Sequence, residues 1–159
     1  MGAVMQFKPD FTLKSIMDLD HSFLSREKIK LIIFDADATL IQAKSRSITK
    51  QIVNKIDSLQ AMGYQIAIAS NGRANRIETI FKGHSIEAYG MSFKPLPFRL
   101  KKHIAGYRKD EVLLVGDQLF TDILCAKLLG IKSLMVEPLG DDIGFGIGLK
   151  RFVERLILK

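Results

Sequence analysis

Residues 31–40 have the sequence Leu-Ile-Ile-Phe-Asp-Ala-Asp-Ala-Thr-Leu, in which four apolar residues lead directly into two carboxylates. A short apolar run that ends in polar residues is typical of a strand buried on both faces of a parallel sheet. Ligands of such sheets bind beyond the carboxyl ends of the strands. The segment therefore predicts an α/β fold with Asp35 and Asp37 at a binding edge. The alternative interpretation is a surface turn that leaves both carboxylates in solvent.

The carboxylates of Asp35 and Asp37 are separated by one residue. Negative charges this close repel each other unless a cation or a shared proton relieves the repulsion. Mg²⁺ suits the position, because it prefers oxygen ligands and is commonly bound together with phosphate. Short motifs of this kind recur by chance, so Asp-x-Asp alone does not distinguish a metal site from a solvated turn.

Three further polar segments follow in the chain. Residues 70–72 (Ser-Asn-Gly) come directly after the apolar run 65–69, and Lys94 stands just before a proline. A third apolar run ends at residues 116–117 (Gly-Asp), and Asp122 follows shortly after. Taken singly, these segments have ordinary explanations: a turn with a helix cap, a solvated loop lysine, and an acid in the first turn of a helix. Their order along the chain is the more specific signal.

This order resembles the four signature motifs of the haloacid dehalogenase (HAD) superfamily of phosphohydrolases. The match spans most of the chain, and its parts are Asp35-x-Asp37-x-Thr39, Ser70, Lys94 and Gly116-Asp117-x-x-x-x-Asp122. The resemblance implies a phosphatase in which Asp35 is the nucleophile and forms an aspartyl-phosphate. Asp37 would protonate the leaving alkoxide and then take a proton from the attacking water, as a general acid and base does.

The resemblance also implies the remaining roles. A hydroxyl, backbone amides and an ammonium group would hold the phosphate, contributed by Ser70, Asn71 and Lys94. Mg²⁺ would be the cofactor, with the ligands Asp35, Asp37 through its backbone carbonyl, Asp117 and Asp122. Thr39 would brace the loop that carries the nucleophile rather than join the chemistry.

Ala38 departs from the family pattern, which usually has Gly or Asn at this position. Both of those residues tolerate a positive φ, which costs an alanine roughly 1 kcal/mol. We therefore expect a slightly shifted loop and reduced activity. All the predicted reacting groups are present, so the departure does not predict an inactive protein.

The pattern along the chain predicts a doubly wound, Rossmann-like α/β domain with helices on both faces of a parallel sheet. About five strands are expected, at residues 30–34, 65–69, 85–88, 112–115 and 132–136. Helices are expected over residues 48–59, 73–82 and 123–128, with terminating glycines at Gly63, Gly83 and Gly130. The intervals leave no room for a cap domain, so we expect an open site suited to macromolecular or membrane-embedded phosphate esters.

The length of 159 residues predicts a single domain. Its expected parts are an N-terminal extension (1–29), a catalytic core (30–140) and a C-terminal amphipathic helix (141–159). The sequence has no apolar stretch long enough to span a membrane and no recognisable signal peptide. Cys125 is the single cysteine and falls in a helical pattern, so we expect it to be a buried apolar residue in a protein of the reducing cytoplasm.

The formal net charge of +7 predicts an anionic partner. The sequence shows no zinc-finger spacing, no aromatic RNP-like strand and no long arginine tract, so it offers no specific nucleic-acid motif. Two basic groups could contact an anionic membrane: Arg99, Lys101, Lys102, His103, Arg108 and Lys109, and on the C-terminal helix Lys150, Arg151, Arg155 and Lys159. The alternative is that these charges are simply solvated and the apolar face of that helix packs on the sheet.

Several segments narrow the resemblance to the YqeG-like phosphatases, which are related to mitochondrial-type phosphatidylglycerophosphatases. These segments are residues 8–10, 15–20, 116–122 and 151–154. The branch implies phosphatidylglycerophosphate as the phosphomonoester substrate, in phospholipid biosynthesis, with an anionic lipid headgroup as the group that is bound. A basic protein without a cap fits a peripheral position on a membrane, since each cation near an anionic surface contributes about 1 kcal/mol.

Three other hypotheses stay open. A soluble phosphatase would use the same site on nucleotide or sugar phosphates, without preference for lipid. A response-regulator receiver also uses an Asp, a hydroxyl and a Lys, but the general acid of the Asp35-x-Asp37 arrangement argues against it. A non-enzymatic module would use the positive surface of the same fold to bind anions, and Ala38 is its only support. The sequence predicts no particular oligomeric state.

Overall fold

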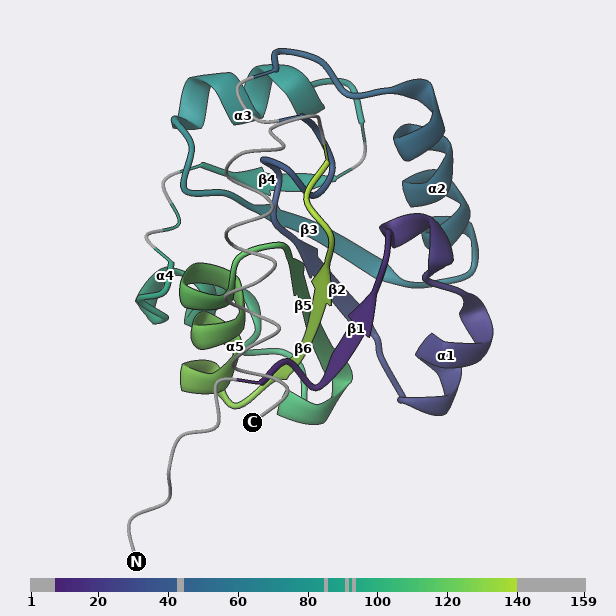
Figure 1. The fold of residues 1–159 in the computed structure, drawn as a ribbon, viewed down its shortest axis with the longest axis vertical. Helices are drawn as coiled ribbons and strands as arrows, with labels where there is room; N and C mark the ends of the chain where they lie inside the picture. Colours follow the sequence, from purple (N-terminus) through teal and green to yellow (C-terminus); the bar gives the residue numbers. More distant parts are fainter. Residues whose placement is uncertain (1–7, 43–44, 85, 91, 93, 140–159) are drawn as a thin grey trace, which may run out of the picture.

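Six parallel strands form one twisted sheet in the order β1-β6-β5-β2-β3-β4 (Figure 1). In chain order the strands are β1 Phe11–Leu13, β2 Leu31–Phe34, β3 Gln65–Ala69, β4 Glu87–Tyr89, β5 Val112–Gly116 and β6 Lys132–Val136. The computed structural model describes residues 8–42, 45–84, 86–90, 92 and 94–139. The predicted C-terminal helix, with its apolar face and basic group, lies outside the described residues. The predicted α/β parallel sheet is confirmed.

The central strand β2 has β5 on one side and β3 on the other. Phe34, its last residue, is in register with Val115 of β5 and with Ile68 of β3. From β2 the chain winds outward through β3 and β4, then returns across the sheet to β5 and continues to β6. The direction of winding therefore reverses between β2 and β5, and ligands of open α/β sheets bind beyond the strand ends at such a switch point.

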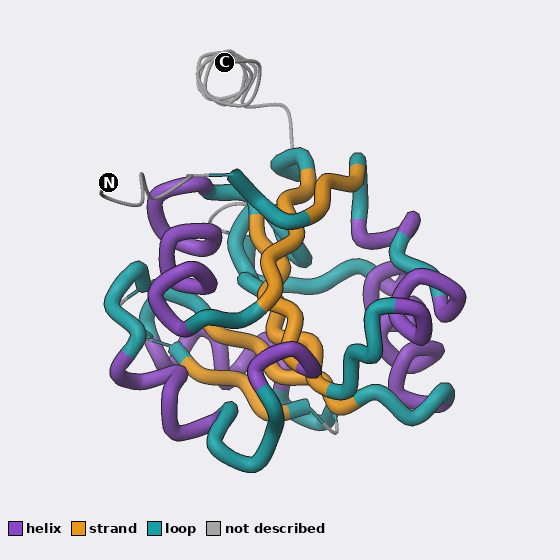
Figure 2. Tube along the Cα trace, turned by 90° about the horizontal axis from the view of Figure 1, so that it is seen from below, coloured by secondary structure: helices purple, strands orange, loops and turns teal. Residues whose placement is uncertain are grey.

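Helices cover both faces of this sheet, as Figure 2 shows. The core on one face includes residues of α1 (His21–Arg26), α2 (Lys50–Ala61) and α3 (Ala74–Phe81), and the core on the other includes residues of α4 (Phe98–His103) and α5 (Leu124–Leu129). The buried strands alternate between the two cores: Ile32 and Phe34 belong to the first, Leu31 and Ile33 to the second. This two-sided burial explains why the strands are continuously apolar.

Helix α2 shows how local sequence sets the element bounds. Thr49 caps its start by accepting a hydrogen bond from the amide of Ile52. Ile52, Ile56 and Leu59 form its buried face, as their spacing predicts. Gly63 follows the end of the helix with φ of 100°, a conformation that favours glycine. Glycines with positive φ also follow α3 and α5, at the predicted positions Gly83 and Gly130.

The remaining differences from the sequence prediction are small. A π-helical turn, Leu119–Ile123, precedes α5, and two short 3₁₀ turns lie at Ile16–Asp18 and Lys109–Glu111. The strand expected at 85–88 is observed as β4, about one residue later. Cys125 is fully buried in the core, as expected. Within the described residues, the chain passes from β2 to α2 and from β3 through α3 to β4 with no inserted domain.

The first strand was not predicted, so the sheet has one strand more than expected. Strand β1 lies at the sheet edge and pairs in parallel with β6, with Phe11 opposite Leu134. Asp10 anchors it: the amide of Ser133 donates to the Asp10 carboxylate over 2.9 Å, and the amide of Asp10 donates to the Ser133 hydroxyl over 2.9 Å. Part of the expected N-terminal extension is thus an integral part of the sheet. No helix among the described residues is long and apolar enough to cross a membrane.

Candidate active site

The loop after β2 turns back sharply on itself. The amide of Asp35 still pairs with Val115 of β5, and the amides of Thr39 and Leu40 then both donate to the carbonyl of Ala36. Ala38 has φ of 62°, the left-handed conformation that its position in the motif predicts. The turn closes where the Ala38 amide donates to the carbonyl of Ile41 over 2.7 Å. An alanine therefore occupies a conformation that glycine or asparagine adopts at lower cost.

Three carboxylates from two loops meet beyond the carboxyl ends of β2 and β5. Asp35, Asp117 and Asp122, here called the acid centre, each offer an oxygen within 4.8 Å of the other two. Their exposed fractions are 7%, 2% and 0%. Lys94 is also buried, and its Nζ donates to Asp35 Oδ1 over 2.7 Å and to Asp122 Oδ1 over 2.5 Å. The structure thus brings together residues from three of the four predicted motifs.

The acid centre is electrostatically unbalanced. Burial, and then the charge of Asp122, raise the pKa of Asp35 well above its ordinary value. The same two causes raise the pKa of Asp117 to about 6. Burial by itself lowers the pKa of Lys94, but the carboxylates of Asp122 and Asp35 outweigh it and raise this pKa above its usual range. When all are ionised, three carboxylates face one ammonium group, and a divalent cation would neutralise the two charges that remain.

Gly116 allows the last carboxylate to approach. A Cβ placed at Gly116 would overlap the carboxyl group of Asp122, so no larger residue fits without displacing it. The amide of Gln118 donates to the other oxygen of Asp122 over 3.3 Å. The Thr39 hydroxyl donates to Asp117 Oδ1 over 3.3 Å. Thr39 therefore links the β2 loop to the β5 loop, in keeping with the bracing role predicted for it.

Ser70 and Asn71, which follow β3, differ in what they contact. The buried Ser70 hydroxyl accepts a hydrogen bond from the amide of Gly72 over 3.0 Å. The Asn71 side chain clamps the Lys94 loop: it donates to the Lys94 carbonyl and accepts from the Lys94 amide, each over 2.8 Å, and accepts from the Ser92 hydroxyl. The Asn71 side chain thus positions Lys94, and a direct role in phosphate binding stays a prediction for its backbone amide.

Asp37 lies outside the acid centre. Its side chain is 32% exposed and forms a two-pronged ion pair with Arg76 of α3, with distances of 2.8 and 3.0 Å. Metal ligation through the Asp37 backbone carbonyl stays a prediction. Arg76 was missed by the sequence analysis, because an arginine on an amphipathic helix looks like an ordinary solvated residue. Its position shortly after the 70–72 motif was the only available signal.

Gly72 marks the point where these groups converge. A Cβ at this position would lie 3.2 Å from Ser70 Oγ, 3.3 Å from Asp37 Oδ2 and 3.4 Å from an Arg76 terminal nitrogen. The Ser70 hydroxyl, the Asp37 carboxylate and the Arg76 guanidinium therefore surround one small volume. The predicted phosphate-binding and acid–base groups accordingly lie side by side at the carboxyl end of the sheet.

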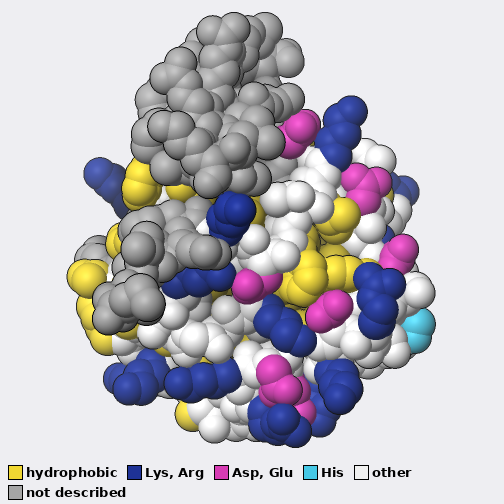
Figure 3. Space-filling view, turned by 60° about the horizontal axis from the view of Figure 1, so that its bottom comes forward, with side chains coloured by type: hydrophobic (Ala, Val, Ile, Leu, Met, Phe, Trp, Pro, Cys, Tyr) yellow, Lys and Arg dark blue, Asp and Glu magenta, His cyan; other side chains and the backbone are white. Residues whose placement is uncertain are grey.

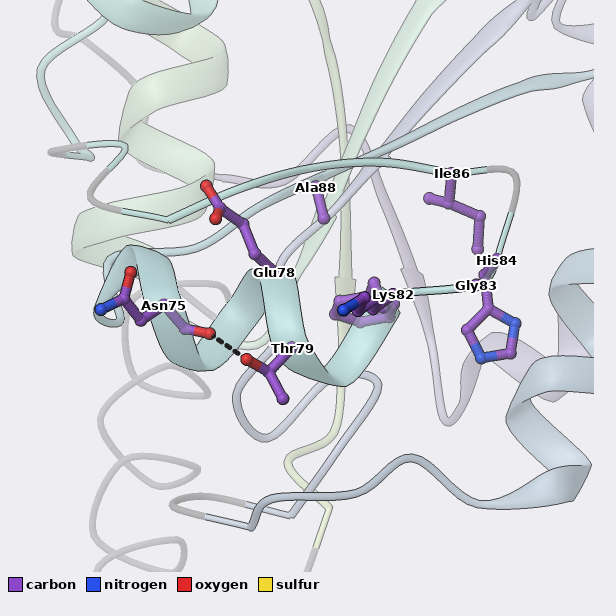
Figure 4. A pocket seen from close by; sticks show the side chains of 9 residues that line it. Asn75, Glu78, Thr79, Lys82, Gly83, His84, Ile86 and Ala88 are labelled. Carbon is purple, nitrogen blue, oxygen red and sulfur yellow. Dashed lines mark hydrogen bonds between the residues drawn. The ribbon is translucent and has the colours of Figure 1, made fainter.

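A separate hollow lies beside the last turn of α3 (Figure 4). It has a volume of about 550 Å³, and the side chains around it include Glu78, Lys82 and His84. The Thr79 hydroxyl, which also faces it, is held by the carbonyl of Asn75 at 2.6 Å. None of the predicted site residues lines this hollow, so it is distinct from the acid centre.

Several solved structures with this architecture are HAD enzymes. A predicted HAD-like hydrolase from Porphyromonas gingivalis superposes with a TM-score of 0.57 at 14% identity, covering 79% of this chain and 98% of that one. A HAD family enzyme from Bacteroides thetaiotaomicron, solved with magnesium and inorganic phosphate, has a TM-score of 0.56 at 14% identity, covering 74% and 98%. A family model described as HAD-hydrolase-like matches residues 93–138. These similarities show that the chain has the fold of HAD enzymes.

A second family model is more specific. It is described as mitochondrial PGP (phosphatidylglycerophosphate) phosphatase and matches residues 2–89, more than half of the chain, which therefore belongs to this family. The probable phosphatase YqeG of Bacillus subtilis is 27% identical over 154 residues, 96% of this chain and 90% of that protein. Phosphatidylglycerophosphate phosphatase 1 of Arabidopsis thaliana is 29% identical over 143 residues, 82% of this chain. The matched region is 41% of the Arabidopsis protein.

Proposed function

We propose that this phosphatase hydrolyses phosphomonoesters with Mg²⁺ as cofactor and a phosphorylated Asp35 as intermediate. The observation that carries the proposal is the acid centre, in which three buried carboxylates lie together and two of them pair with the buried Lys94. Burying unbalanced charge is costly, so such a cluster calls for a cation and a chemical purpose. The HAD enzyme of similar fold that was solved with magnesium and phosphate supports the same chemistry.

The side chains divide the reaction into two in-line displacements. An Asp35 oxygen attacks phosphorus, the new O–P bond forms, and the bond from phosphorus to the leaving oxygen breaks. Asp37 gives its proton to that oxygen, and then takes a proton from the water that attacks the aspartyl-phosphate and releases inorganic phosphate. Ser70 and Lys94 hold the phosphoryl oxygens throughout.

The metal would be held by the acid centre, where all the side-chain donors are hard oxygen atoms. When bound, Mg²⁺ neutralises negative charge on the phosphoryl group and keeps the buried carboxylates ionised. Lys94 contacts Asp35 and Asp122, and so supplies positive charge that belongs to the protein itself.

Phosphatidylglycerophosphate is the substrate that we propose. Family membership and the Arabidopsis relative support it, as does the net charge of +7. The segments that follow two site residues also expose large apolar side chains: Leu96 and Phe98 follow Lys94, and Phe120 follows Asp117, with exposed fractions of 54%, 53% and 48%. Apolar side chains at this edge suit contact with the interface of a bilayer, where they can be buried without a protein partner.

The positions of the basic side chains support membrane contact at this edge only in part. Arg99, Lys101 and Lys102 are exposed on α4, which begins shortly after Lys94. Arg108 and Lys109 of the same predicted cluster lie instead just before the amino end of β5, where Arg108 pairs with Asp110 over 3.1 Å. Figure 3 shows that lower end of the molecule, where acidic side chains are interspersed among the basic ones. We therefore assign membrane contact to the α4 end of the cluster.

The test is phosphate release in the presence of Mg²⁺, with phosphatidylglycerophosphate in mixed micelles compared with a panel of soluble phosphomonoesters and with Asp35→Asn as the blank. Preferential hydrolysis of the lipid is the expected result. Hydrolysis of soluble esters alone would retain the phosphatase and reject the lipid substrate. No hydrolysis by folded protein would favour the anion-binding module.

Membrane contact has its own test. Leu96→Ser with Phe98→Ser should weaken cosedimentation with vesicles of anionic lipid by about tenfold or more, because burial of two half-exposed side chains of this size contributes about 1.5–3 kcal/mol in total. The matched control is Met62→Ser with Leu128→Ser, which removes two exposed apolar side chains elsewhere on the surface. Equal vesicle binding by both variants would argue against membrane contact through Leu96 and Phe98.

A further inference from the structure

Three arginines line a groove next to the candidate active site. The groove has a volume of about 800 Å³ and runs along α3. Its lining residues are Arg46, Arg73, Ala74, Asn75, Arg76, Thr79 and Ile80. None of the described residues that line it is acidic, and alanine and isoleucine supply an apolar part of its wall. We call it the arginine groove.

Arg76 joins the arginine groove to the acid–base group of the site. Its two terminal nitrogens bind the two oxygens of Asp37. Its Nε donates to the carbonyl of Ser45 over 3.0 Å, which fixes the loop that carries Arg46 beside α3. One side chain thus orients Asp37 and also places a second arginine in the groove.

The position of Asp37 indicates what enters the groove. In the proposed function, which this inference takes as its basis, Asp37 protonates the oxygen of the leaving group. The atoms attached to that oxygen must therefore extend past Asp37 and away from the buried acid centre. Arg76 pairs with Asp37 and also lines the arginine groove, so this groove is an adjacent recess that can take the rest of the leaving group.

The charges of the groove select an anionic leaving group. Asp37 balances Arg76, whereas no ion pair in the described part of the chain engages the exposed side chains of Arg46 and Arg73. A planar guanidinium donates two parallel hydrogen bonds to a phosphate, and two of them on one wall can hold it from two directions. The apolar wall beside them suits the carbon atoms of a short linker.

We infer that the arginine groove binds a second phosphate group of the substrate, namely the phosphodiester that lies one glycerol unit away from the scissile phosphate in phosphatidylglycerophosphate. Arg46 and Arg73 are then specificity-determining residues. They distinguish this headgroup from monoesters that carry a single phosphate, and they act without any contribution from the acyl chains.

The experiment uses soluble esters, so that membrane binding does not enter the result. Glycerophosphoglycerol phosphate, the headgroup without its acyl chains, is compared with glycerol 3-phosphate, which lacks the phosphodiester. Wild-type protein and Arg46→Gln with Arg73→Gln are assayed for kcat/KM on both. The matched control is Arg26→Gln with Arg108→Gln, which removes the same charge from two largely exposed side chains outside the groove.

We expect wild-type protein to prefer glycerophosphoglycerol phosphate. The groove variant should lose about tenfold or more in kcat/KM on that ester, as expected for lost charge-assisted hydrogen bonds, and stay within about twofold on glycerol 3-phosphate.

Equal losses on both esters, or an equal loss in the control variant, would overturn the inference and leave the phosphatase intact. A sugar bisphosphate is assayed in parallel. Preference of wild-type protein for it would also overturn the inference, since the second phosphate would then belong to a soluble substrate. Hydrolysis of phosphatidylglycerophosphate in mixed micelles without hydrolysis of glycerophosphoglycerol phosphate would overturn this inference and leave the proposed function intact, whereas inactivity on the lipid as well would contradict both.

Discussion

Asp35 and Asp37 are separated by a single residue, yet the fold gives them opposite surroundings. Asp35 is buried among Asp117, Asp122 and Lys94, and its pKa is raised first by burial and then by the charge of Asp122. Asp37 is one-third exposed and is paired with Arg76. A group that must attack phosphorus benefits from a dry, fixed position, whereas one that exchanges protons with water needs access to it. The different surroundings of the two carboxylates therefore suit the two different roles that we propose for them.

The largest loss of activity should come from replacing the buried carboxylate, Asp35. Asp35→Asn removes the attacking oxygen, and loss of a nucleophile that acts as part of a unit lowers kcat by about 10⁴-fold or more. The metal-free variant should be at least as stable as wild type, because a neutral amide replaces a buried carboxylate whose ionisation the fold disfavours. Steady-state assays and thermal unfolding check both parts. Near wild-type turnover would remove Asp35 from the mechanism.

The rate loss caused by removing the exposed carboxylate, Asp37, should depend on the leaving group. Asp37→Asn should lose roughly 10²–10⁴ in rate on an alkyl phosphate, the usual contribution of a general acid. The loss should be much smaller on p-nitrophenyl phosphate, whose leaving group departs without a proton. Rates on the two esters, measured on one protein preparation, check this. A loss below tenfold on the alkyl ester, or the same loss on both, would mean that Asp37 does not act as the acid.

Stabilisation by Mg²⁺ should depend on the acid centre and not on the side chain of Asp37. At 100 times its Kd, Mg²⁺ should stabilise wild-type protein by about 2.7 kcal/mol and raise Tm by about 5–10 °C. Asp117→Asn should abolish most of this shift, because one of three ligands loses its charge. Asp37→Asn, the matched control, keeps the acid centre and should retain the shift. A shift that survives in Asp117→Asn would place the metal elsewhere.

The smallest effect concerns the turn that directly follows the two carboxylates. Ala38→Gly should raise the free energy of unfolding by about 0.5–1 kcal/mol, since glycine adopts the observed φ of 62° without strain. Ala61→Gly, in the last turn of α2, is the control and should lower it by up to about 1 kcal/mol. Denaturant titration measures both. Loss of stability in Ala38→Gly would show that the turn is not strained.

Much of this arrangement could be predicted from the sequence, for identifiable reasons. The central strands are continuously apolar because both of their faces are covered, and their bounds follow from the polar residues at their ends. The residues of the acid centre follow directly after β2 or shortly after β5. These strands are neighbours at the switch point, so the topology of the sheet brings the three carboxylates together. The terminating glycines were likewise predictable, because the conformation they adopt is specific to glycine.

What could not be predicted depends on contacts between distant residues. Strand β1 has three residues, too few to show a period, and its position depends on the pairing of Asp10 with Ser133. Arg76 is recognisable only when Asp37 is seen beside it. Asn71 was predicted to contact phosphate through its backbone amide, and the role of its side chain, which holds the Lys94 loop, was not predicted. In each case, the contact that defines the role is absent from local sequence.

The most direct test of the central claim is to locate the phosphoryl group during turnover. Wild-type protein would be mixed with substrate and Mg²⁺, quenched rapidly in acid, reduced with borohydride and digested for peptide mass spectrometry. Reduction converts an aspartyl-phosphate to homoserine, so the account predicts homoserine at position 35 and only when substrate was present. Homoserine at position 37 or 117, or none at all during rapid phosphate release, would contradict it.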